Sequence, residues 1–169
     1  MDQWGTERPI EDFEKGFLGQ ADDELRDYYR LFLAKRDSMG TISKNWMAVL
    51  DENSAAQSAV VMHYGMKKSD WDELNEARSD ESIPGTGRVC DDGYIWWKWR
   101  IPFRNAYSFF TGLDSTGEET LGLYCHTEYI NADGILDVET VDKVMDGELP
   151  DTYGVLKGNA EESEDEDGS

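Results

Sequence analysis

Apolar residues recur at helical spacing near the start of the chain. Between residues 22 and 36 the apolar positions form one stripe, which consists of Leu25, Tyr28, Tyr29, Phe32 and Leu33. Acidic residues open this segment, and Lys35 and Arg36 close it, which complements the helix dipole. The pattern predicts a helix over residues 22–36.

The same kind of spacing predicts three further helices before residue 80. A second helix opens at Thr41 or Ser43, and a third runs from Ser54 to Gly65 through a stretch rich in alanine and valine. A fourth begins at Ser69, because serine followed three residues later by an acid has the spacing of a capping box. We therefore expect the N-terminal half to be helical.

The hydrophobic pattern changes to a strand-like period after the loop "SDESIPGTG". The segments "RVC" and "YIWWKWRIPF" flank a good hairpin turn at residues 91–93, and "AYSFFTGL" and "ETLGLYCHTEYI" flank a second turn. A third turn, "NADG", precedes "ILDVETV". The pattern predicts an antiparallel meander of four or five strands.

Together these elements predict an α+β fold in which N-terminal helices pack on a C-terminal antiparallel meander. We expect a single domain over residues 1–158, helical in 1–80 and sheet in 86–145. Residues 159–169 contain six acids and almost no apolar side chain, which predicts a disordered acidic tail.

Residues 54–78 have the spacing of a helix-turn-helix, with Gly65 as the turn and Trp71 and Leu74 as anchors of the second helix. The hairpin at residues 91–93 would then be the wing of a winged-helix domain. On this alternative the chain is a DNA-binding regulator with an autoinhibitory acidic tail. Its nucleic-acid contacts would be Lys67, Lys68, Arg78, Trp96, Lys98 and Arg100.

Alternation along "YIWWKWRI" separates two faces of one strand. It predicts that Ile95, Trp97, Trp99 and Ile101 lie in the core, opposite Tyr94, Trp96, Lys98 and Arg100. An exposed aromatic and basic face could stack bases or bind a protein. The plainer alternative is that Trp96 is covered and that Lys98 and Arg100 pair with neighbouring acids.

Charge is the strongest compositional feature. The chain has a net charge of -21, and residues 105–158 hold 11 acidic and 2 basic side chains. Such a field repels phosphates and attracts basic proteins, although solubility or adaptation to salt would also explain acidity. A helix-turn-helix in this context would have little net attraction for DNA.

Catalytic and metal-binding chemistry have little support in the sequence. The loop at residues 129–140 has part of a calcium-binding pattern, but Tyr129 and Thr140 stand where acidic ligands belong, so a turn is the better interpretation. The chain has two histidines and two cysteines, and none of them has a companion at ligand spacing. We expect no enzyme activity, no metal and no cofactor.

These observations favour an acidic interaction protein that mimics nucleic acid and inhibits a basic nucleic-acid-binding protein or complex. By analogy of composition, phage-encoded anti-defence and host-takeover proteins are of this kind. Candidate partner contacts are Asp22, Asp23, Asp27, Asp91, Asp92, Glu118, Glu119 and Asp133. A structural subunit of a larger assembly is a further alternative. Without a signal peptide or an apolar run of membrane-spanning length, we expect a cytoplasmic protein that does not enter membranes.

Overall fold

The computed structural model describes residues 20–35, 45–75, 83–116 and 118–156. The chain divides into two compact units, residues 1–44 and residues 45–169, which we describe separately. Among the described residues, no helix combines the length and the apolar composition needed to cross a membrane.

In the first unit the structure describes one helix, α1 (Asp22–Lys35), which confirms the predicted first helix. Asp22, Asp23 and Glu24 occupy its first turn, where carboxylates interact favourably with the helix dipole. Asp23 also forms an ion pair with Arg26 one turn later.

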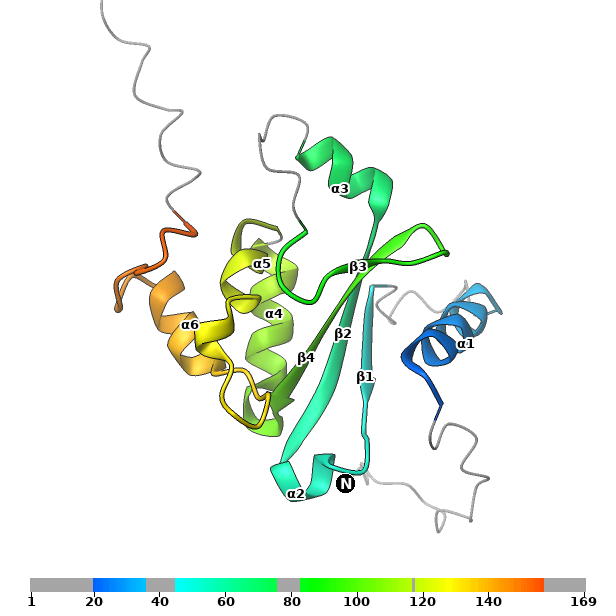
Figure 1. The fold of residues 1–169 in the computed structure, drawn as a ribbon, viewed down its shortest axis with the longest axis horizontal. Coiled ribbons are helices and arrows are strands. Elements are labelled where there is room, and N and C mark those ends of the chain that lie inside the picture. Colours follow the sequence, from blue (N-terminus) through cyan, green and yellow to red (C-terminus); the bar gives the residue numbers. More distant parts are fainter. Residues whose placement is uncertain (1–19, 36–44, 76–82, 117, 157–169) are drawn as a thin grey trace, which may run out of the picture. The chain divides into compact units, whose positions relative to one another are not determined.

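The second unit is built on a four-stranded antiparallel sheet with the order β1-β2-β4-β3. The strands are β1 (Trp46–Val49), β2 (Ala59–Lys67), β3 (Arg88–Val89) and β4 (Tyr94–Pro102). The two central strands pair along their whole length, from Ala59 opposite Pro102 to Lys67 opposite Tyr94. Figure 1 shows β2 and β4 as the long central pair.

Short helices connect and cover this sheet. Before β4 the structure has α2 (Ser54–Gln57) and α3 (Lys68–Leu74). After β4 a 3-10 turn (Phe103–Asn105) leads into α4 (Ala106–Thr116) and α5 (Glu118–Tyr124). A second 3-10 turn (Thr127–Tyr129) then precedes α6 (Val138–Met145). In Figure 1, α4, α5 and α6 lie together on one side of the sheet.

The predicted order of helices and strands is therefore wrong, although the sheet has one of the expected numbers of strands. Two of the four strands come before residue 68, inside the segment predicted to be helical. The predicted strands at residues 106–113, 119–130 and 135–141 are also wrong, because helices occupy residues 106–116, 118–124 and 138–145. The predicted hairpin around residues 91–93 does form, between β3 and β4.

The predicted helix-turn-helix is absent because its first helix is mostly the strand β2. The helical start is real but short: α2 ends at Gln57, and its C-cap Ser58 adopts a left-handed conformation with φ of 50°. β2 then runs in the centre of the sheet, and almost all of its side chains are buried. A strand buried on both faces is a continuous apolar run without alternation, so its sequence resembles a buried helix.

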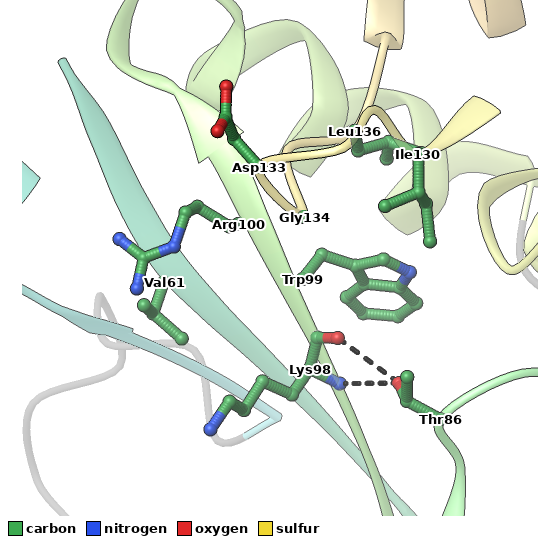
Figure 2. A pocket seen from close by; sticks show the side chains of 9 residues that line it. All are labelled: Val61, Thr86, Lys98, Trp99, Arg100, Ile130, Asp133, Gly134 and Leu136. Atoms are coloured by element: carbon green, nitrogen blue, oxygen red, sulfur yellow. Dashed lines mark hydrogen bonds between the residues drawn. The ribbon is translucent and has the colours of Figure 1, made fainter. Parts of the chain in front are cut away.

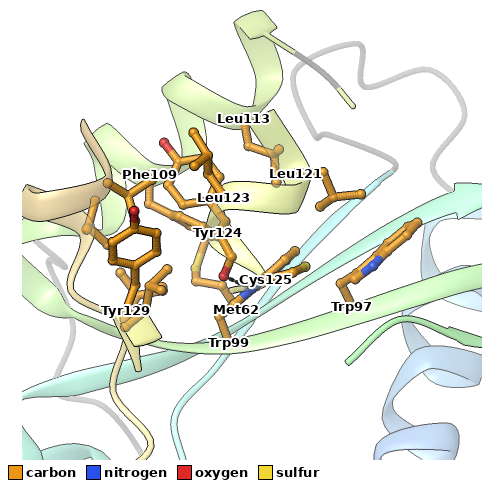
Figure 3. Packing of buried hydrophobic residues seen from close by; sticks show 14 of the residues in the cluster. Met62, Trp97, Trp99, Phe109, Leu113, Leu121, Leu123, Tyr124, Cys125 and Tyr129 are labelled. Atoms are coloured by element: carbon orange, nitrogen blue, oxygen red, sulfur yellow. Dashed lines mark hydrogen bonds between the residues drawn. The ribbon is translucent and has the colours of Figure 1, made fainter. Parts of the chain in front are cut away.

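The core lies between the sheet and the three C-terminal helices. Ile95, Trp97, Trp99 and Ile101 of β4 are at most 4% exposed, which confirms the predicted core face of this strand. The Trp99 indole donates a hydrogen bond to the Tyr124 carbonyl at 3.0 Å and meets Phe109 edge to face. Figure 3 shows Phe109, Leu113 and Leu123 gathered over Trp99.

Candidate protein-binding surface

Carboxylates are concentrated in the segment that contains α6 and the turns beside it. Residues 128–151 hold eight acids and a single basic residue, Lys143. We call the exposed members of this group the acidic surface; they are Glu128, Asp133, Asp137, Glu139, Asp146 and Glu148. No other segment of this length among the described residues has so large an excess of acid.

Local hydrogen bonds fix the backbone that carries the acidic surface. The Asn131 side-chain oxygen accepts hydrogen bonds from the backbone amides of Asp133 and Ile135, and Gly134 has a positive φ of 75°. Asp137 caps α6, because its carboxylate accepts from the Thr140 amide at 3.2 Å and from the Thr140 hydroxyl at 2.7 Å. These bonds hold the turn and the start of the helix in one arrangement.

The predicted turn at residues 131–134 is confirmed, but it leads into a helix rather than a strand. The Asn131 oxygen, which a calcium loop would direct at the cation, is used by two backbone amides. Within the described ranges, no cluster of three or more His, Cys, Asp or Glu side chains could hold a metal ion.

The electrostatics of α6 show how closely its acids lie. The pKa of Asp142 is raised, first because the carboxyl is partly buried and then because Asp146 and Glu139 repel its charge. The Tyr124 hydroxyl donates a hydrogen bond to this carboxyl at 3.3 Å, which opposes the rise. Repulsion within one helix face is the property expected of a surface that attracts cations.

The predicted partner contacts belong to several different elements. Asp133 belongs to the acidic surface, whereas Asp22, Asp23 and Asp27 lie on α1 in the other unit. α5 begins with Glu118 and Glu119. Sequence reasoning missed the α6 acids Glu139, Asp142 and Asp146, whose spacing of three and four residues is a helical signal.

Asp92 has a structural role in the β3–β4 turn, whereas its neighbour Asp91 is exposed. One Asp92 oxygen accepts from the Tyr94 amide at 2.9 Å, and the other accepts from the Trp96 indole at 3.1 Å. Gly93, with φ of 80°, completes the turn. Substituting Asp92 would therefore disturb the hairpin as well as the surface charge.

The predicted nucleic-acid contacts do not form one exposed cationic platform. Trp96 is only 3% exposed, Lys68 pairs with Asp72 on α3, and both terminal nitrogens of Arg100 bond the Asp51 carboxylate. Lys67 ends β2 and Lys98 is exposed on β4. Arg78 lies outside the described residues.

The edge of β4 beyond the short strand β3 borders a pocket of about 320 Å³. Figure 2 shows Thr86 at one end, bonded to the backbone of Lys98, and the turn containing Asp133 and Gly134 at the other. The Leu136 amide donates to the Arg100 carbonyl at 2.9 Å. Side-chain and loop bonds therefore occupy this edge, which disfavours pairing with an added strand.

Arg100, which lines this pocket, forms an ion pair with Asp51 as well as hydrogen bonds to it. Its side chain lowers the pKa of Asp51 to about 2, with further hydrogen bonds to that carboxylate from Ser54 and the Asn53 amide. The pair connects the turn after β1 to β4, two elements that are far apart in the sequence. The ion pair between Asp51 and Arg100 therefore has a structural role.

Comparison with known proteins finds no family model, no curated protein and no solved structure that matches this chain.

Proposed function

We propose that this chain is an acidic interaction protein that binds a basic, nucleic-acid-binding partner and occupies the surface where that partner holds nucleic acid. The observation that carries the proposal is the concentration of exposed carboxylates on α6 and its flanking turns. The proposal also expects the chain to act in the cytoplasm, without enzyme activity or cofactor, in the manner of a phage-encoded inhibitor.

The spacing of the α6 carboxylates supports mimicry of a phosphate backbone. A helix rises about 1.5 Å per residue, so Glu139, Asp142 and Asp146 are about 5 Å apart on average along its axis. One strand of B-form DNA carries a charge about every 3.4 Å of axis. The two charge densities differ by less than a factor of about two.

The overall charge favours a protein partner over DNA itself. A chain with a net charge of -21 repels a duplex and accelerates encounter with a basic surface. The winged-helix alternative loses its structural basis, because residues 59–67 form a strand in the centre of the sheet. We therefore do not propose direct reading of DNA.

A displacement experiment tests the proposal. The immobilised chain captures proteins from a nuclease-treated extract of the cells that express it, and each captured protein is then loaded with a fluorescent duplex. We expect the free chain to release the duplex, more effectively at low salt. A variant with Glu139→Gln and Asp146→Asn should release it at least about tenfold less effectively, because rim charges govern encounter and salt dependence.

The matched control carries Asp70→Asn and Glu73→Gln, which remove two exposed charges from α3. This control should release the duplex as the unmodified chain does. Equal release by the α6 variant and the unmodified chain would contradict the proposal. A captured protein that keeps its duplex while the chain is bound, or salt-sensitive binding of the chain alone to the duplex, would also contradict it.

A further inference from the structure

Two aromatic side chains are exposed just before and at the start of α4. Tyr107 is 77% exposed and Phe103 is 48% exposed. Phe103 belongs to the 3-10 turn that leads into α4, and its amide donates to the Ser58 carbonyl at 2.9 Å. The turn is therefore anchored within the second unit (residues 45–169), which we call the sheet unit, while both rings are exposed.

Arg104 connects this aromatic pair to the acidic surface. Its Nε donates to a Glu139 carboxylate oxygen at 3.2 Å, across the boundary between the turn and α6. Asp142 follows on the same helix and Asp146 caps its end, and both Glu139 and Asp146 lie close enough to Asp142 to repel its charge. The turn that carries the rings is thus bonded to α6 at one of its carboxylates, and the Arg104 cation of this contact is already paired.

Exposed aromatic rings beside carboxylates are chemically suited to one kind of side chain in particular. A guanidinium group stacks on aromatic faces and also binds carboxylates through two parallel hydrogen bonds. An ammonium group is a compact, strongly hydrated charge that stacks less well. A single exposed aromatic residue would need no explanation, but a pair at the margin of a charged row has the anatomy of a binding hot spot.

We infer that Phe103 and Tyr107, together with Glu139, Asp142 and Asp146, form the docking surface for an arginine-rich segment of the basic partner. This inference rests on the proposed function and makes it more specific. Arginines of the partner stack on the two rings, while neighbouring arginines pair with the α6 carboxylates. The rings supply selectivity for arginine over lysine, and the carboxylates supply attraction to both.

The test compares fluorescent oligo-arginine and oligo-lysine peptides of equal length, titrated with the full chain and followed by anisotropy at low and moderate salt. The unmodified chain should bind oligo-arginine at least about fivefold more tightly, the effect of two exposed cation–π contacts. The variant with Phe103→Leu and Tyr107→Leu keeps apolar side chains but loses the aromatic faces. In this variant the ratio of the affinities for oligo-arginine and oligo-lysine should fall to near unity, while the affinity for oligo-lysine stays the same.

Two controls separate failure of this inference from failure of the proposed function. Tyr28→Leu removes an exposed tyrosine from α1 and should leave the arginine preference unchanged. Glu139→Gln with Asp146→Asn should weaken the binding of both peptides. If the leucine variant keeps the preference, or the unmodified chain has none, the inference is overturned while the role of the carboxylates stands. If removing the carboxylates changes neither affinity, or neither peptide binds, the proposed function fails as well.

Discussion

Replacing Asp51 with asparagine should destabilise the sheet unit in a way that depends on pH. The Asp51 carboxylate accepts from both terminal nitrogens of Arg100, from the Ser54 hydroxyl at 2.9 Å and from the Asn53 amide at 3.1 Å. These bonds hold the turn after β1 against the central strand β4. The substitution removes the charge and keeps the size of the side chain.

The magnitude follows from the pKa of Asp51, which Arg100 lowers from 3.8 to about 2. At about 1.4 kcal/mol for each pKa unit, this difference corresponds to about 2.5 kcal/mol of folding free energy. The two side chains are 25% and 17% exposed, so solvent screens part of their interaction. We therefore expect the free energy of unfolding at neutral pH to fall by about 1 to 2 kcal/mol.

The pKa of Asp51 is lower in the folded than in the unfolded chain. The charged carboxylate therefore makes its full contribution to stability at a pH above the pKa of the unfolded chain. The contribution disappears as the pH falls through the folded value. The difference between the unmodified chain and Asp51→Asn should therefore be constant above about pH 5 and should be mostly lost at about pH 2. Urea unfolding followed by tryptophan fluorescence measures it, because five of the six tryptophans lie in the sheet unit.

The surface pair of Arg104 and Glu139 provides the control. Its side chains are 76% and 55% exposed, so Glu139→Gln should change the free energy of unfolding by less than about 0.5 kcal/mol at any pH. A difference for Asp51→Asn that is equally large at pH 2 and pH 7 would refute the electrostatic reasoning. A loss at neutral pH no larger than that of the control would refute it too.

Three further predictions concern individual side chains of the second unit. Gly112→Ala should lower the free energy of unfolding by about 1 to 3 kcal/mol, because the new Cβ would lie 2.7 Å from the Tyr124 hydroxyl oxygen. Urea unfolding measures this loss, and adding Tyr124→Phe to the variant should restore part of it. Asp142→Asn should leave the melting temperature at neutral pH unchanged or higher, since burial and neighbouring acids raise the pKa of this carboxyl and so disfavour its charge; a marked decrease would contradict this. Burial raises the pKa of the Cys125 thiol to about 12, so in the folded chain a thiol reagent should modify the partly exposed Cys90 and reach Cys125 only after denaturant is added.

Where local pattern and final environment agree, the sequence predicts the structure well. The stripe from Leu25 to Phe32 and its charged ends predict α1, and two short runs around an Asp-Gly turn predict the β3–β4 hairpin. Alternation correctly predicts the core face of β4, although Trp96 on the other face is buried as well. Each of these features depends on residues that are close together in the chain.

The wrong predictions arise where one hydrophobic pattern is compatible with both a helix and a strand. β2 was predicted to be helical because its alanine and valine run has no alternation, a result of burial on both faces of the sheet. α4 was predicted to be a strand because aromatic residues favour strands, yet Phe109 and Leu113 are four residues apart and both face the core. α6 was also predicted to be a strand, although its sequence has clear helical signals: a capping aspartate, Asp137, and valines at 138, 141 and 144.

The candidate site shows the same division between local and tertiary information. The sequence alone determines the excess of carboxylate in the C-terminal third and the turn at residues 131–134. Only the tertiary structure places Glu139 against Arg104, leaves Phe103 and Tyr107 exposed, and joins Asp51 to Arg100. The physical reason is that composition and turn chemistry act over a few residues, whereas these contacts join residues 35 and 49 positions apart and exist only after the sheet and helices have packed.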